Sequence, residues 1–210
     1  MSTGARQAHW ENIYTTKAEG EVSWFEDSPG VSLKLIKAAG ASQTAAIIDV
    51  GGGASRLVDT LIDLGYQNVT VLDLSEAALA MAKTRMGNKS QSVHWIVADA
   101  TTWQPSAKNY DVWHDRAAFH FLTDEYDREA YVARLKEALR PGGAAIIGSF
   151  SLDGPEKCSG LPVQRYDAVS LGQILGPSFS LVQTLDHEHR TPWGASQKFQ
   201  FSRFVFDPKT

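Results

Sequence analysis

The sequence predicts an α/β fold: an open, doubly wound, mostly parallel sheet with helices on both of its faces. Three observations support this prediction. Short apolar segments alternate with segments of helical periodicity between residues 45 and 150. The connections between them are short, as in right-handed strand–helix–strand units. The first apolar segment, residues 45–50, ends in three glycines, and a helical pattern follows at once.

Length and composition indicate one globular domain. The chain has 210 residues, of which 43% are hydrophobic, which is too few residues for two full domains. The net charge is −4 and no Lys/Arg-dense run is present, so nucleic acid is not an expected partner. The single cysteine, Cys158, excludes an intrachain disulfide. With no apolar signal core and no membrane-spanning run, we expect a cytoplasmic protein without a membrane partner.

Two helices are expected before the first strand. Residues 5–14 carry apolar side chains on one helical face, and a Ser-Pro pair at residues 28–29 begins a second helix that ends near Gly40. Between them, Trp24 and Phe25 either cover a ligand or fasten the N-terminal segment to the core.

The later elements follow from apolar runs and their flanking residues. Ser75 and Glu76 open one helix, Gly65 ends another, and residues 140–143 (Arg-Pro-Gly-Gly) form a turn. After Gly154 the pattern changes to a short helix and two strands that can form an antiparallel end of the sheet. The expected strands are residues 45–50, 69–72, 93–97, 110–113, 144–150, 179–185 and 199–206, and the expected helices are residues 55–64, 77–86, a stretch around 131–139, and 171–175.

Carboxylates follow three successive strands of the predicted sheet. Asp49, Asp73 and Asp99 fall at strand ends, where an open α/β sheet forms its ligand crevice. Asp73 follows Gly51 at about the spacing of a ribose-binding acid, and Asp99 sits where an adenine amino group could bind. Each Asp alone is explained as well by a turn or a helix cap. Combined with the glycine turn, they favour a nucleoside-bearing cofactor.

The glycine turn does not suit a dinucleotide. Gly51 and Gly53 are present, but Arg56 occupies the third glycine position of G-x-G-x-x-G. A G-x-x-x-x-G-K phosphate loop is also absent. The site therefore suits a nucleoside without a pyrophosphate.

A series of motifs across residues 45–150 resembles the class I S-adenosylmethionine-dependent methyltransferases. The order and spacing of the motifs are those of the family, although Gly52 stands where relatives often carry another residue. The motifs are Asp49-Val50-Gly51-Gly52-Gly53-Ala54-Ser55, Val71-Leu72-Asp73-Leu74-Ser75, Ala98-Asp99-Ala100, Tyr110-Asp111-Val112 and Leu139-Arg140-Pro141-Gly142-Gly143.

The resemblance implies a seven-stranded sheet whose last strand is antiparallel, and S-adenosylmethionine as the cofactor. It divides the single domain, residues 1–210, into a helical cap (1–40), a cofactor-binding core (45–150), and a substrate-side loop with the C-terminal strands (151–210). In the implied site, Gly51 and Gly53 pass under the methionine part and Asp73 holds the ribose. The implied cofactor-binding residues are Asp49, Gly51, Gly52, Gly53, Asp73, Leu74, Asp99, Ala100, Thr101, Trp24 and His114.

The segment from His114 to Phe121 follows the fourth strand and is expected to border the transferred methyl group. His114, Asp115 and His120 are the candidate catalytic residues, because an imidazole can take a proton from an acceptor that must lose one. A packed, hydrogen-bonded role explains each histidine about equally well. Arg116 either binds an acidic substrate group or pairs with Asp115.

A loop at residues 156–166 lies at the active-site end and is expected to choose the substrate. Its candidate substrate residues are Cys158 and Arg165, besides Arg116. His187 and His189 with Cys158 match no metal motif, so no metal site is predicted.

Two further resemblances concern the acceptor. Asp115-Arg116-Ala117 is similar to thiopurine and related thiol methyltransferases, whereas Trp10-Glu11-x-x-Tyr14 with residues 22–25 resembles small protein lysine methyltransferases. We therefore expect a methyltransferase acting on a small molecule, possibly a thiol or other soft nucleophile. The alternatives are a protein lysine N-methyltransferase, a non-catalytic S-adenosylmethionine-binding protein and, more distantly, a dehydrogenase. The sequence does not indicate an oligomeric state.

Overall fold

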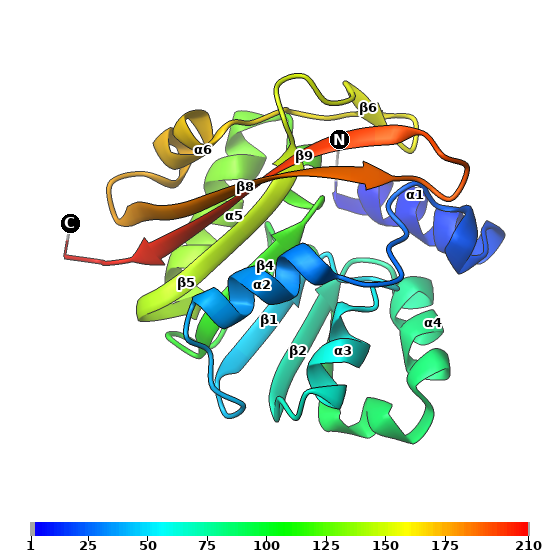
Figure 1. Ribbon diagram of the computed structural model, residues 1–210, viewed down its shortest axis with the longest axis horizontal. Helices are drawn as coiled ribbons and strands as arrows, with labels where there is room; N and C mark the ends of the chain where they lie inside the picture. The colour runs from blue at the N-terminus through cyan, green and yellow to red at the C-terminus, as the bar shows by residue number, and fades with distance from the viewer. Residues whose placement is uncertain (1–2, 210) are drawn as a thin grey trace.

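The protein is built on one seven-stranded sheet, seen in a computed structural model that describes residues 3–209 (Figure 1). The central strands have runs of buried apolar residues, as the sequence predicts, whereas the two edge strands are largely exposed or half-buried. The strands of this sheet are β1 (Ala46–Val50), β2 (Asn68–Asp73), β3 (Val93–Val97), β4 (Tyr110–Arg116), β5 (Leu139–Phe150), β8 (Phe179–Arg190) and β9 (Ser196–Phe206).

The strand order is β3-β2-β1-β4-β5-β9-β8. Strands β1 to β5 are parallel to their neighbours, while β9 pairs in antiparallel fashion with both β5 and β8. The predicted mostly parallel, seven-stranded sheet with an antiparallel last strand is therefore confirmed. The chain leaves β1 in one direction toward β3 and then crosses to β4 on the other side. This reversal opens a crevice at the carboxyl ends of β1 and β4.

Helices cover both faces of the sheet (Figure 1). Because side chains alternate along a strand, Ile47 of β1 packs toward one layer of helices and Ile48 toward the other. Helices α2, α3 and α4 contribute to the first core, and α5 and α6 to the second. The helices are α1 (Thr3–Thr16), α2 (Gly30–Ala38), α3 (Leu57–Asp63), α4 (Glu76–Met86), α5 (Glu125–Ala138) and α6 (Ala168–Leu175), with single turns η1 (Glu19–Glu21), η2 (Gly87–Ser92) and η3 (Phe119–Phe121) and a small hairpin of β6 (Lys157–Cys158) and β7 (Leu161–Pro162).

Several strands differ from their predicted bounds: β8 continues to Arg190 and β9 begins at Ser196, and the differences in β4 and β5 bear on the site. The expected turn at residues 140–143 belongs to the start of β5, where Leu139 already pairs with Tyr110. Strand β4 continues to Arg116 rather than ending at Trp113. A strand sends successive side chains to opposite faces, so His114 and Arg116 point to one face and Asp115 to the other.

Helix α1 is fastened to the start of α4. Glu11 accepts a hydrogen bond from the Ser75 hydroxyl (2.7 Å) and another from the Ala77 N–H (3.2 Å). A carboxylate at a helix N-terminus satisfies free N–H groups there and is favoured by the helix dipole. These contacts hold α1 beside the carboxyl ends of β1 and β2.

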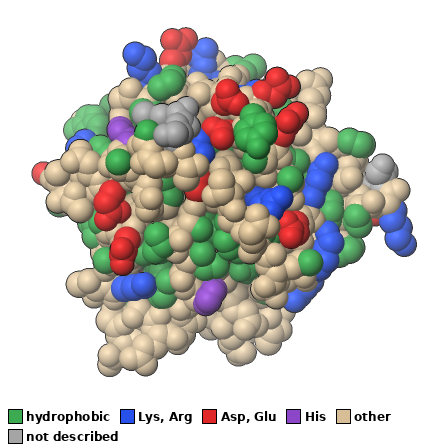
Figure 2. Space-filling view, turned by 180° about the vertical axis from the view of Figure 1, so that it is seen from behind, with side chains coloured by type: hydrophobic (Ala, Val, Ile, Leu, Met, Phe, Trp, Pro, Cys, Tyr) green, Lys and Arg blue, Asp and Glu red, His purple; other side chains and the backbone are tan. Residues whose placement is uncertain are grey.

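On the face shown in Figure 2, basic and acidic side chains are mixed rather than gathered into one large patch of a single sign. Within residues 3–209, no helix is both long enough and apolar enough to cross a bilayer.

The packing of β5 against β9 predicts the effect of one substitution. Gly148 faces the buried ring of Phe201 across the strand pair, and an added Cβ would overlap that ring. We expect Gly148→Ala to lower the free energy of unfolding by about 1–3 kcal/mol in urea denaturation. The control is Gly172→Ala in α6, where the Cβ would make an ordinary 3.4 Å contact with Phe204. This control should change stability by less than about 1 kcal/mol, and equal losses in both variants would contradict the packing.

Candidate active site

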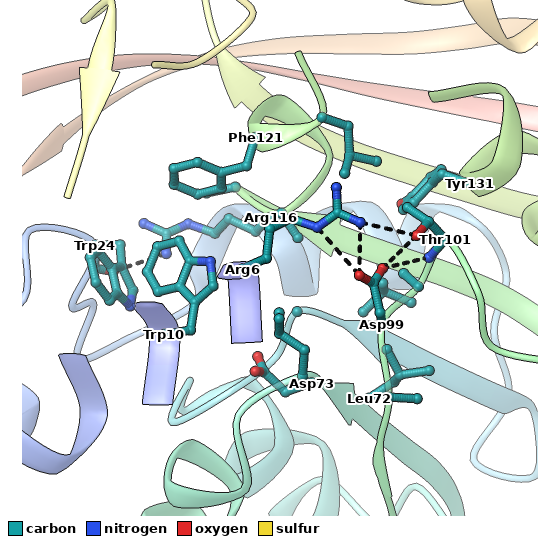
Figure 3. Close-up of a pocket in the computed structure, with 18 of the residues that line it drawn as sticks. Arg6, Trp10, Trp24, Leu72, Asp73, Asp99, Thr101, Arg116, Phe121 and Tyr131 are labelled. Atoms are coloured by element: carbon teal, nitrogen blue, oxygen red, sulfur yellow. Dashed lines mark hydrogen bonds and ion pairs between the residues drawn. The ribbon is translucent and has the colours of Figure 1, made fainter. Parts of the chain in front are cut away.

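A cavity lies at the carboxyl edge of the sheet, at the predicted crevice (Figure 3). The ends of β1, β2 and β4 and the segment after β3 form its floor, and α1 covers it. The predicted site residues that line the cavity are Gly51, Asp73, Leu74, Asp99, Ala100, Thr101, Trp24, Arg116 and Cys158. The predicted site residues that do not line it are Asp49, Gly52, Gly53, His114, Asp115, His120 and Arg165.

The glycine turn allows backbone segments to approach closely. Gly51 has a φ of 68°, and its N–H donates to the Leu72 carbonyl at 2.7 Å. A Cβ at Gly51 would overlap Ala118, and one at Gly52 would lie 2.6 Å from a carboxylate oxygen of Asp49. A side chain at either position would therefore clash with these neighbours and distort the turn. The result is bare backbone at the cavity floor, a cradle that fits the methionine end of S-adenosylmethionine.

Asp73 presents a buried carboxylate to the cavity. Only 5% of its surface is exposed, and its Oδ1 accepts from the Ser75 N–H at 2.8 Å. Burial, together with the nearby charge of Asp49, raises the pKa of Asp73 to about 7. A hydroxyl donor in the cavity would stabilise the ionised form.

Asp99 is already fully hydrogen-bonded. Its Oδ1 accepts from the Thr101 N–H (2.9 Å) and hydroxyl (2.7 Å), and its Oδ2 accepts from Arg6 at 2.8 and 3.3 Å. Although burial opposes it, these hydrogen bonds hold the pKa of Asp99 below its ordinary value. An adenine amino group could reach Asp99 only by displacing or sharing one of these donors (Figure 3).

Helix α1 supplies three cavity residues that the sequence analysis did not identify as site residues. Arg6, Trp10 and Tyr14 are spaced four residues apart, so they lie on one face of α1 and line the cavity. Arg6 also pairs with Asp127 of α5. The sequence signal for this face is the four-residue spacing of one cation and two aromatic residues. The signal is weak because α1 has little amphipathic pattern, so the sequence does not show which face of the helix is buried.

Aromatic rings form the wall opposite the glycine turn. Trp10 contacts Trp24 and Phe121 with ring centroids 5.5 and 4.9 Å apart, in edge-to-face geometry. Trp24 lines the cavity and also fastens α1 through its contact with Trp10, and its role in covering a ligand stays a prediction.

His114 lies on the face of the sheet covered by α2, away from the cavity. Its Nδ1 is 2.7 Å from Asp49 Oδ1, and its Nε2 is 2.8 Å from the Ser32 hydroxyl. All three groups are buried. The imidazole joins β1, β4 and α2, and the structure does not bring it to the position expected for a base.

Asp115 lies on the opposite face and shapes the turn after β4. Its carboxylate accepts from the Ala118 N–H at 3.0 Å and from the Tyr131 hydroxyl at 2.7 Å. Burial raises its pKa to about 6, although these hydrogen bonds oppose the shift. The turn includes Ala117 with a φ of 66°, and it carries Ala118 against Gly51.

His120 is fully buried between aromatic rings. Its Nδ1 lies 3.4 Å from the Phe150 N–H, and its ring is 4.5 Å from Phe121 and 4.8 Å from Phe150 between centroids. Burial, together with the charge of Arg116, lowers the pKa of His120 to about 3. The imidazole is therefore neutral at physiological pH.

Arg116 is buried in the cavity wall and does not pair with Asp115, so that interpretation of the residue is wrong. It donates to the Trp24 carbonyl at 3.0 Å, and its Nε lies 3.5 Å from Glu26. Its Nε and Nη2 are buried without a hydrogen-bond partner among the described residues. Burial lowers its pKa, and the charge of Glu26 opposes the shift.

The two loop candidates have different places. Cys158 lines the cavity with its sulfur 3.8 Å from the Ser23 hydroxyl, and burial raises the pKa of its thiol. Arg165 lies outside the cavity, pairing with Glu156 at 3.2 Å and donating to the Gly154 carbonyl.

The burial of His120 predicts a pH effect on stability. Unfolded imidazole takes up a proton below about pH 6.5, whereas folded His120 does so only near pH 3, so stability is lost as pH falls across this interval. His120→Asn should flatten the dependence of the unfolding free energy on pH between these values, measured by urea denaturation. His94→Asn, at an exposed position of β3, is the control and should keep the wild-type slope. Parallel curves for wild type and His120→Asn would show that His120 titrates normally.

Sequence comparisons identify methyltransferases. Residues 47–143 match the methyltransferase domain family. The chain is 29% identical to EEF1A lysine methyltransferase 2 of Danio rerio over 191 residues, 84% of this chain and 76% of that protein. It is 30% identical to N-terminal Xaa-Pro-Lys N-methyltransferase 1 of Mus musculus over 105 residues, 50% of this chain. The chain thus spans 47% of the latter protein's length.

Solved structures share the fold. One, from work on the conversion of a disulfide bond into a thioacetal group during echinomycin biosynthesis, has a TM-score of 0.77 at 21% identity and covers 96% of this chain and 91% of its own. Another is 1,6-didemethyltoxoflavin-N1-methyltransferase of Burkholderia thailandensis with bound S-adenosylhomocysteine, with a TM-score of 0.73 at 20% identity, covering 99% and 91%.

The motifs, the strand order with its antiparallel last strand, the glycine cradle and the methyltransferase relatives agree. Residues 47–143 carry a methyltransferase domain, and the motifs, the fold and the relatives support a class I S-adenosylmethionine-dependent methyltransferase with S-adenosylmethionine as its cofactor.

Proposed function

We propose that the cavity binds S-adenosylmethionine and directs methyl transfer to a small molecule whose nucleophilic atom is anionic or easily ionised, such as a thiol. When bound, the cofactor supplies an electrophilic methyl group. The observation that carries the proposal is the charge of the cavity wall: the buried guanidinium of Arg116 lies there, and no histidine lines the cavity within residues 3–209.

On the cofactor side, residue roles follow from the donors and acceptors in place. The bare backbone at Gly51 would lie under the amino-acid part, and Asp73 would accept hydrogen bonds from the ribose hydroxyls. The apolar side chains of Leu74 and Ala100 suit the adenine ring. Asp99 would act largely by holding Thr101 and Arg6 in place, since both of its oxygens are engaged.

On the acceptor side, the wall favours an acceptor that needs no base. An ammonium group must lose a proton before it can attack, and a guanidinium nearby disfavours its approach. A thiolate needs no such step, and Arg116 would lower the pKa of a bound thiol. The rings of Trp10, Trp24 and Phe121 exclude water, which strengthens this electrostatic effect and aligns the nucleophile.

A protein lysine or N-terminal amine is the second candidate acceptor. The relatives EEF1A lysine methyltransferase 2 and N-terminal Xaa-Pro-Lys N-methyltransferase 1 favour it by their names. Glu26, beside Arg116, is an acidic group that could attract a cationic acceptor.

The deciding experiment supplies methyl-labelled S-adenosylmethionine to the protein with matched sets of acceptors. The sets are small thiols, small amines, and peptides with internal or N-terminal lysine, and mass spectrometry identifies the labelled product. Labelling confined to thiols supports the proposal. Labelling of peptide amines with none of thiols would overturn it in favour of the second candidate.

Substitution of Asp73 tests the cofactor side. We expect Asp73→Ala to weaken binding of S-adenosylmethionine and of its demethylated product by about 1–3 kcal/mol, because ribose hydroxyls would lose their acceptor. Calorimetric titration measures this, with NADH as a ligand expected not to bind. The matched control is Asp111→Ala, since Asp111 pairs with Arg140 away from the cavity. Unchanged affinity in Asp73→Ala would remove this residue from the ribose role.

Substitution of Arg116 tests the acceptor side. Arg116→Ala should lower turnover of a thiol acceptor by roughly 10- to 100-fold, because a charge-assisted contact is lost. Arg116→Lys should recover part of the loss, and cofactor affinity should stay close to wild type in both. Arg165→Ala, outside the cavity, serves as the control with unchanged turnover. A parallel loss of cofactor affinity and turnover in Arg116→Ala would indicate a structural role only.

A further inference from the structure

Two histidines of β8 meet a glutamate behind the acceptor end of the cavity. His187 and His189 are two residues apart on one strand, so their side chains lie on the same face. Glu26, from the segment between η1 and α2, approaches them, and one ligand atom of each residue lies within 4.8 Å of the others. We infer that Glu26, His187 and His189 form a binding site for a divalent transition-metal ion such as Zn²⁺.

The distance between two of the three ligand atoms fits a tetrahedral ion. Glu26 Oε1 and His187 Nε2 are 3.4 Å apart. With bonds of about 2.0–2.1 Å, two ligands of a tetrahedral zinc ion lie roughly 3.4 Å from each other. Imidazole nitrogens and a carboxylate oxygen are a ligand set that zinc accepts. Three protein ligands leave one coordination position for water or an anion.

Neighbouring groups orient two of the three ligands. His189 Nε2 lies 2.7 Å from the Ser23 carbonyl, which can only accept, so this nitrogen carries the proton and Nδ1 keeps a free lone pair. Such a hydrogen bond to a carbonyl is the usual outer support of a metal-binding histidine. Glu26 directs its other oxygen, Oε2, toward Arg116 at 3.5 Å.

Buried polar atoms that make no hydrogen bond within residues 3–209 gather around the same place. His187 Nε2, Gln197 Oε1 and two nitrogens of Arg116 are buried without hydrogen-bond partners among the described residues. Gln197 is the cross-strand neighbour of His189. Buried polar groups in native proteins are nearly always paired, so such a concentration indicates a ligand. An ion bound to His187 would satisfy one of these atoms directly.

The positive charge of Arg116 repels a bound cation, and the geometry limits this repulsion. The guanidinium approaches Glu26 Oε2, whereas His187 approaches Oε1. The two cations would therefore use different oxygens of one carboxylate. An anion in the open coordination position would offset the remaining positive charge.

The test is metal titration of the full, tag-free chain after treatment with a chelator. Calorimetry with Zn²⁺ should give one ion per chain, and Co²⁺ should give the visible absorption of a tetrahedral site. His187→Ala and Glu26→Gln should weaken zinc binding by at least roughly 100-fold, because each removes a ligand. His94→Ala removes an exposed imidazole far along the sheet on β3 and should leave binding unchanged.

Two results of the zinc titration would overturn the proposed metal site. The absence of saturable zinc binding by the wild type would overturn it, as would equal affinity in wild type and His187→Ala. Thermal unfolding in chelator shows whether a variant is folded, and Glu26→Gln keeps the size of the side chain if His187→Ala does not fold. Since the readout is metal binding, the result stands apart from the identity of the methyl acceptor.

Discussion

The burial of three consecutive polar residues at the end of β4 constrains the whole site. His114, Asp115 and Arg116 lie on a central strand, so each needs a partner from another element. His114 holds Asp49 just before the glycine turn, Asp115 holds the turn after β4, and Arg116 holds the segment around Trp24. The end of β4 thereby positions three parts of the cavity: the glycine turn at its floor, the turn after β4 at one side, and the aromatic wall.

This arrangement separates the histidines from the chemistry. Methyl transfer from a sulfonium needs alignment and exclusion of water, and it needs a base only when the acceptor holds its proton. His114 serves as a bridge between strands and His120 is held neutral in an aromatic layer. In the proposed function, the guanidinium of Arg116 in the cavity wall would favour acceptors that ionise readily.

Local patterns in the sequence predicted most of the fold. The strand at residues 93–97 was predicted with its observed bounds, and Asp49, Asp73 and Asp99 do mark strand ends, because apolar runs and the residues that stop them are local features. The length of β4 was not predictable, since polar residues continue it only where distant partners satisfy them. Arg6 could not be predicted for the same reason, because its partner Asp99 is far away in the sequence. Glu26 and His187 are also far apart in the sequence, so no local pattern predicts that they meet.

The attachment of α1 has a kinetic consequence. Arg6 binds Asp99 and Asp127 from above the cavity, while Glu11 binds the start of α4. In the proposed function, these contacts would retain a nucleoside bound beneath this helix, and exchange with solvent would follow their breaking. Entry of the cofactor and departure of its demethylated product would then share one gate, whose opening rate sets a ceiling on turnover however fast the methyl group moves.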